Sequence, residues 1–91
     1  MVADENKVID GQYYKKGDEI WDLGSLECIE VNGSQRSYFG FLNDKDKLPK
    51  YDNLGTGSKA ILVDEAGNSD TVIAYYHAPS RIWYNLQGGV V

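Results

Sequence analysis

Few residues of this chain could carry covalent or metal chemistry. His77 is its one histidine and Cys28 its one cysteine, so together they supply two ligands where a structural zinc site needs four. A catalytic triad needs a serine or cysteine beside a histidine and a carboxylate, and no G-x-S-x-G motif is present. We therefore expect no catalytic residue, no metal site and no cofactor, and we interpret His77 as a strand-end side chain.

Carboxylates offer two further possibilities. Asp44-Lys45-Asp46 is similar to the start of a calcium loop, but the sixth position is Pro49 and the twelfth is Gly55, where such a loop needs Gly and Glu. The carboxylate pair of a glycoside hydrolase meets only in the folded chain, so sequence spacing cannot reveal one. A small hydrolase with such a pair in a cleft stays open as a third class of function.

Aromatic side chains give the strongest functional signal. The chain has seven Tyr, two Trp and two Phe, more large rings than one small core can bury. Exposed Tyr and Trp supply contact area at low entropic cost, so the surplus rings predict a binding surface. Alternatively, the Tyr rings lie flat on a sheet with their hydroxyls in water. The candidate interface residues are Trp83, Tyr84, Tyr75, Tyr76, Trp21 and Tyr38.

Composition limits the partners that this chain can bind. Its net charge is -5 and its nine basic residues are scattered, which argues against binding of nucleic acid. The lone cysteine excludes an intramolecular disulfide. Since no long apolar run is present and the N-terminus is acidic and polar, we expect neither a membrane span nor a signal peptide, and synthesis in the cytoplasm. A chain of 91 residues has room for one core of marginal stability, which association would increase.

The clearest strand pattern lies in residues 57–86. Three runs rich in β-branched and aromatic residues are separated by turn residues, so we predict a three-stranded antiparallel meander. The middle run is apolar on both of its alternating faces, which places it at the centre of the sheet with side chains packed above and below it. The three predicted strands are residues 60–63, 71–77 and 81–86.

A second meander is predicted in residues 17–41. Gly24-Ser25 and Asn32-Gly33 are typical hairpin turns, and Cys28 falls on the inward face of the middle strand. The predicted strands are residues 19–23, 26–31 and 35–41, and a further short hairpin pairs residues 7–9 with 12–15 around an Asp10-Gly11 turn.

The segment from 43 to 56 has no period and is rich in Asp, Lys, Asn, Gly and Pro, so it predicts a connecting loop. We interpret it as a crossover between two sheets, with Leu48, Tyr51 and Leu54 pinning it to a sheet. A functional loop is the alternative. Together the patterns predict one all-β domain over residues 1–91, a small antiparallel β-sandwich or barrel built from two three-stranded meanders.

Part of the chain resembles a known class of proteins. Residues 57–64, Gly-Ser-Lys-Ala-Ile-Leu-Val-Asp, and the later pair Trp83-Tyr84 resemble small proteins encoded among the structural genes of tailed bacteriophages and prophages. The resemblance covers residues 55–86 and departs from the usual pattern in its longer first turn, 65–69. It implies a small β protein of the virion, attached in many copies to head or tail, and it brings no catalytic residues.

Two hypotheses follow from these observations. The first is a non-enzymatic structural or decoration protein of the virion, made in the host bacterial cytoplasm. It would bind other virion proteins or copies of itself through exposed aromatics and sheet edges, form a homo-oligomer or multi-copy assembly, and bind neither nucleic acid nor membrane. The alternative is a carbohydrate-binding module that stacks sugars on Trp83, Tyr75 or Tyr76.

Overall fold

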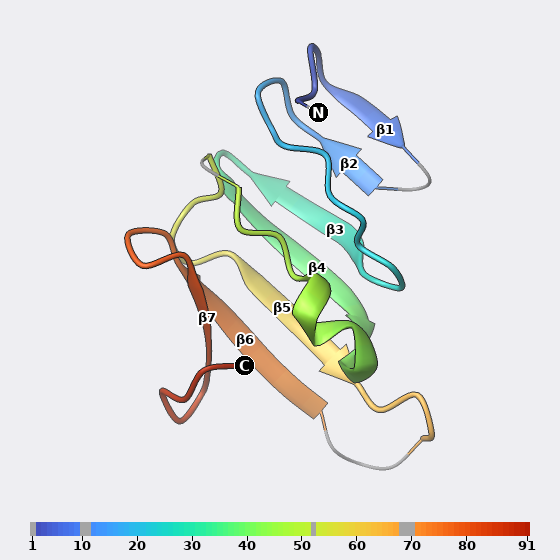
Figure 1. The fold of residues 1–91 in the computed structure, drawn as a ribbon, viewed down its shortest axis with the longest axis vertical. Coiled ribbons are helices and arrows are strands. Elements are labelled where there is room, and N and C mark those ends of the chain that lie inside the picture. The colour runs from blue at the N-terminus through green and yellow to red at the C-terminus, as the bar shows by residue number, and fades with distance from the viewer. Residues whose placement is uncertain (1, 10–11, 52, 68–70) are drawn as a thin grey trace.

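The structure, a computed structural model, describes residues 2–9, 12–51, 53–67 and 71–91. These residues form a mostly β fold, as predicted, with a two-stranded sheet, β1-β2, and a five-stranded sheet in the order β3-β4-β5-β6-β7 (Figure 1). The predicted Asp10-Gly11 turn and the end of the predicted 65–69 turn lie outside the described residues. The elements are β1 (Lys7–Ile9), β2 (Gln12–Tyr14), β3 (Glu27–Asn32), β4 (Gln35–Phe41), the 3-10 helix η1 (Leu42–Lys47), β5 (Lys59–Val63), β6 (Thr71–His77) and β7 (Ile82–Asn85).

The strand pairings predicted within residues 57–86 are present, but the three strands belong to a five-stranded sheet and do not form a sheet of their own. β5 pairs with β6 and β6 with β7, both antiparallel, and the register sets Ile61 opposite Ile73 and Tyr75 opposite Tyr84. As predicted, the 71–77 strand is internal, since β6 has β5 on one side and β7 on the other, while the middle strand of the whole five-stranded sheet is β5. The hairpin of residues 7–9 with 12–15 is also confirmed, as β1 and β2.

The meander predicted in residues 17–41 is only partly correct. Its β3-β4 hairpin forms, but its turn residues are Gly33 and Ser34 and not the predicted Asn32-Gly33, because Asn32 pairs with Gln35; Gly33 has a positive φ of 64°. Residues 19–23 are not a strand: Glu19 makes a single bridge to Val2. The reason is that Leu23 and Leu26 are both buried, so this segment turns into the core instead of extending along the sheet.

The two halves of the chain join in one sheet by a parallel pair. β4 and β5 run parallel, with Phe39 opposite Ile61, whereas the sequence pattern predicts antiparallel pairs alone. Parallel neighbours cannot be joined by a tight turn and need a crossover connection. Residues 42–58 provide it, and they include η1, a helical turn inside the segment that was interpreted as irregular.

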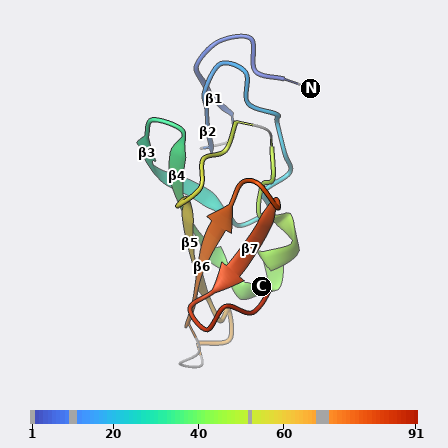
Figure 2. The same cartoon turned by 90° about the vertical axis from the view of Figure 1, so that its left-hand side faces the viewer.

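The crossover covers one face of the five-stranded sheet, which we call the core face. Figure 2 shows η1 and the segment after it on one side of the sheet. Leu48, Tyr51 and Leu54 are each 2% exposed or less, so their predicted role as anchors is confirmed. The sheet residues they join in the core are Tyr38, Ala60, Leu62, Ala74, Tyr76 and Trp83.

An ion pair inside the protein ties the N-terminal segment to the sheet. Asp18 lies 2.9 Å from Arg36 of β4, and both side chains are fully buried. Asp18 also accepts a hydrogen bond from the backbone N–H of Lys15, and the Arg36 guanidinium lies 5.8 Å from the centre of the Tyr51 ring. This contact fixes the 15–18 turn against β4.

Candidate interaction surface

The second face of the five-stranded sheet carries an apolar surface that no described element covers. Residues opposite one another in paired strands share a face, and the register sets Phe39, Ile61 and Ile73 in one row across β4, β5 and β6. Figure 2 shows no element of the described chain against this side. We call it the outer face, and its apolar side chains are Phe39, Phe41, Ile61, Val63, Ile73, Tyr75, Ile82 and Tyr84.

The outer face is more apolar than a solvent-facing sheet surface usually is. Phe39 is 42% exposed, Phe41 38% and Tyr75 44%, and the remaining apolar members are half-buried by their neighbours. Antiparallel sheets with one solvated face normally alternate apolar and polar residues. On β5 and β6, Ile61 and Ile73 point outward. They are larger than Ala60 and Ala74, which point inward and are buried. An uncovered apolar surface of this extent is typical of an interaction site.

The sequence pattern held part of this information. The strand at 71–77 is apolar on both faces, which predicts packing above and below it. In the structure its core-face residues Ala74 and Tyr76 are buried, but Ile73 and Tyr75 face outward with nothing on top of them in the described chain. The prediction of packing on both faces is therefore wrong for the single chain. The same doubly apolar alternation in the strand 60–63 is the signal that could have identified Ile61 and Val63.

Three of the six aromatic candidates are not available to a partner. Trp83 is 2% exposed, Tyr76 2% and Tyr38 1%, so the prediction that they form an exposed interface is wrong. The reason is that the crossover needs rings beneath it: the Trp83 indole N–H donates to the Pro49 carbonyl at 2.9 Å. Its ring centre also lies 5.1 Å from that of Tyr76 and 6.2 Å from that of Tyr38.

The other three candidates have different surroundings. Tyr75 and Tyr84 are opposite each other on the outer face, Tyr75 exposed and Tyr84 half-buried. Trp21 lies outside the outer face and packs, half-buried, against the core. Its indole N–H is buried without a hydrogen-bond partner in the described ranges. The structure therefore brings two of the six predicted residues together on one surface.

Tyr38 and Tyr51 form a buried hydroxyl pair beneath the crossover. Their oxygens are 2.6 Å apart. Burial is the main cause that raises the pKa of Tyr38 well above its ordinary value, and proximity to Tyr51 raises it further. Burial also raises the pKa of Tyr51 to about 12. The pair is thus held neutral and acts as a core contact.

The two edges of the sheet are poorly suited to adding a strand. Beyond β7 the C-terminal residues fold back: Val91 donates to the Trp83 carbonyl at 3.0 Å, and Asn85 donates to the Gly89 carbonyl at 2.7 Å. At the other edge, β3 has a bulge between Cys28 and Glu30. Covered ends and bulges are devices that prevent edge pairing, so the outer face is the better candidate surface than the edges.

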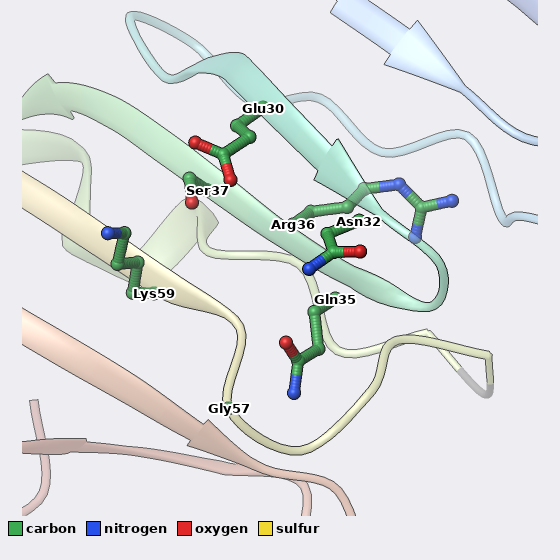
Figure 3. Close-up of a pocket in the computed structure, with 7 residues that line it drawn as sticks. All are labelled: Glu30, Asn32, Gln35, Arg36, Ser37, Gly57 and Lys59. Atoms are coloured by element: carbon green, nitrogen blue, oxygen red, sulfur yellow. The ribbon is translucent and has the colours of Figure 1, made fainter.

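A polar hollow lies at one end of the outer face, beside the β3-β4 turn. It encloses about 150 Å³ and is lined by polar groups. Figure 3 shows Glu30 and Lys59 on either side of Ser37, while the guanidinium of Arg36 points away from them. Such a set of donors and acceptors can hold water or a polar side chain of a partner. The remaining lining residues are Asn32, Gln35 and Gly57.

The residues considered for chemistry have local roles in the structure. His77 Nδ1 lies 2.7 Å from Ser80 Oγ, three residues along the β6-β7 turn, and this hydroxyl also donates to the His77 carbonyl at 3.3 Å. These contacts close the turn. Among the residues with described positions, no group of three His, Cys, Asp or Glu lies close enough together to hold a metal ion.

Comparisons of the chain with protein-family models, curated protein sequences and solved structures give no match. In the described ranges, the chain has no helix whose length and apolar character would suit it to cross a membrane. The geometry of the outer face is therefore the observation on which a functional proposal has to be built.

Proposed function

We propose that this chain is a non-enzymatic structural protein that binds neighbouring protein subunits through its outer face. The observation that carries the proposal is the row Phe39, Ile61 and Ile73, flanked by Phe41 and Tyr75, left uncovered on a five-stranded sheet. Fully burying an exposed side chain of this kind contributes about 1.5–3 kcal/mol, and since Phe39, Phe41 and Tyr75 are 38–44% exposed, a partner that covers them gains roughly half of this for each.

The resemblance over residues 55–86 supplies the setting that we propose for this binding. A virion protein present in many copies has an uncovered surface only until it meets its neighbours in the particle. A sheet of a neighbouring subunit laid on the outer face would also complete the β-sandwich that the strand pattern predicts, since two sheets pack face to face about 10 Å apart.

The carbohydrate-binding alternative has less support. Of the three rings suggested for sugar stacking, Trp83 and Tyr76 are in the core, and Tyr75 alone is exposed. The polar neighbours of Tyr75 in the register are Lys59 and Tyr84, and the row Phe39, Ile61 and Ile73 beside it offers no hydrogen bonds to sugar hydroxyls. A protein surface with matching apolar side chains fits this environment better.

The proposal is tested in particles of the phage or prophage that encodes the chain. We expect quantitative mass spectrometry of purified particles to find the chain in many copies. A variant with Phe39→Ser and Tyr75→Ser should fold, as judged by circular dichroism, yet be lost from the particles. Val8→Ser is the matched control, because Val8 is also apolar and exposed but lies on β1, outside the outer face. Particles without the chain would contradict the virion setting, and full retention of the double variant would contradict the role of the outer face.

A further inference from the structure

We propose that the outer face binds a second copy of this chain, so that two five-stranded sheets pack face to face across a two-fold axis. This inference rests on the proposed function and names the partner of the same surface. Its first support is the size of the surface that has to be covered.

A single helix is too narrow to cover the outer face. The apolar side chains of the outer face come from four strands, β4 to β7, which at a spacing of about 4.8 Å span roughly 19 Å, whereas an α-helix is about 10 Å across. The occupant must therefore be another sheet or a layer of several helices. A second copy presents a sheet of identical width with the same apolar rows, and the two inner surfaces can interdigitate as they do in a β-sandwich.

The area of the outer face also suits a dimer. With about five residues per strand at about 3.3 Å each, the sheet covers a planar area on the order of 400 Å². Because side chains make the real surface rougher than its plane, two copies together bury on the order of 1,000 Å². Stable specific interfaces bury about 1,200–2,000 Å², and about 1,000 Å² is the lower limit for a biological interface, so we expect a weak, reversible dimer.

The charges on the outer face are complementary between two copies. Glu30 and Lys59 lie in one row on either side of Ser37, and both are exposed. No ion pair joins either of them to another charged group in the described part of the chain. A two-fold axis that runs along the strands near β4 brings Lys59 of one copy within reach of Glu30 of the other, with the two sheets offset across their width. Symmetry then forms the contact twice.

Sedimentation equilibrium of the purified full chain tests the inference directly. We expect a monomer–dimer equilibrium with no larger species, because a two-fold interface uses the same surface of both copies and is therefore closed. Phe39→Ser with Tyr75→Ser should weaken dimerisation by about 100-fold or more, since central aromatic side chains dominate such interfaces. The Val8→Ser control should dimerise like the natural chain.

Charge reversal provides a second test with variants that should fold, because both side chains are exposed. Glu30→Lys alone and Lys59→Glu alone should each weaken dimerisation by about tenfold or more, and the double reversal should restore most of it. Equal dimerisation in the single reversals and the natural chain would overturn the arrangement. A chain that stays monomeric at all concentrations would overturn the inference. If the same outer-face residues were still needed for incorporation into particles, the proposed function would stand with a different partner.

Discussion

At the scale of single residues, the buried hydroxyl pair of Tyr38 and Tyr51 makes the folded state less stable as the pH rises above about 10. Both pKa values are raised in the folded chain, that of Tyr51 to about 12, whereas an unfolded tyrosine titrates near 10. The folded state therefore keeps protons that the unfolded state releases. The stabilising effect is complete below about pH 10 and is lost as the pH rises from there toward the folded values.

Urea unfolding at several pH values checks this dependence. We expect the free energy of unfolding to fall between about pH 10 and about pH 12, and to fall less steeply in a variant with both Tyr38→Phe and Tyr51→Phe. The comparison uses the slope of each protein against pH, because the double variant also loses the hydroxyl contact. An equal slope in the two proteins would show that these tyrosines do not retain their protons in the folded chain.

The buried ion pair of Asp18 and Arg36 gives a second residue-scale prediction. Arg36→Met leaves the Asp18 carboxylate buried without its cation, so we expect a loss of about 3–5 kcal/mol in the free energy of unfolding. Asp18→Leu in the same chain should recover part of this loss. The exposed pair Asp4–Lys7 provides the control, since Lys7→Ala should leave the urea midpoint unchanged. A small effect of Arg36→Met would contradict the burial of the pair.

Cys28 provides a third prediction at this scale. It lies opposite Tyr38 on the core face and is half-buried there, in agreement with the inward position that the alternation of the strand predicts. Burial raises the pKa of its thiol, which reduces the reactive thiolate. We expect iodoacetamide to label it several-fold more slowly in native buffer than in urea. Equal labelling rates in the two conditions would contradict this position.

The alternation of residues predicts which side chains share a face, but it does not predict which face is covered. Tyr75 and Tyr76 are neighbours of the same type, and one is exposed while the other is in the core. The difference arises from the crossover, which lies over Tyr76 and Trp83 and not over Tyr75. Since that segment has no period, its position on the sheet could not be inferred from local pattern.

At the scale of elements, the parallel pair of β4 and β5 is the feature that hairpin signals cannot predict. Turn residues such as Asn32-Gly33 specify antiparallel neighbours, and they correctly predicted the β3-β4 hairpin. Pairing between distant strands depends on packing across the whole chain. The strand predicted at 19–23 failed for a related reason, because Leu23 and Leu26 are drawn into the core.

A close approach between elements at Gly40 gives a fourth prediction. A Cβ at Gly40 would lie 2.8 Å from the Cα of Leu26, so Gly40→Ala forces two backbones apart. We expect it to cost about 3 kcal/mol of unfolding free energy, measured by urea denaturation, which is the upper end of the usual range for overpacking because the contact is with backbone. Gly67→Ala is the control: its Cβ meets nothing within 4 Å, and the positive φ of 80° costs only about 1 kcal/mol. Equal costs at the two positions would contradict the contact.

At the scale of the whole molecule, one face of the five-stranded sheet is covered and the other is not. The crossover, which includes η1, covers the core face (Figure 2). The outer face presents Phe39, Ile61 and Ile73 to solvent. Small domains bury a limited fraction of their surface, so covering this face by association increases stability as well as assembling the complex. The strand pattern predicts two packed layers, and in our proposal the second layer comes from another subunit.

Hydroxyl-radical footprinting across a dilution series, read by mass spectrometry, tests most directly whether the outer face is a binding surface. If it is, oxidation of Phe39 and Tyr75 falls several-fold from dilute to concentrated protein, or on addition of the particle proteins, while oxidation of Val8 on β1 stays constant. Oxidation of Phe39 and Tyr75 that is the same at every concentration and in the presence of the particle proteins would contradict the account.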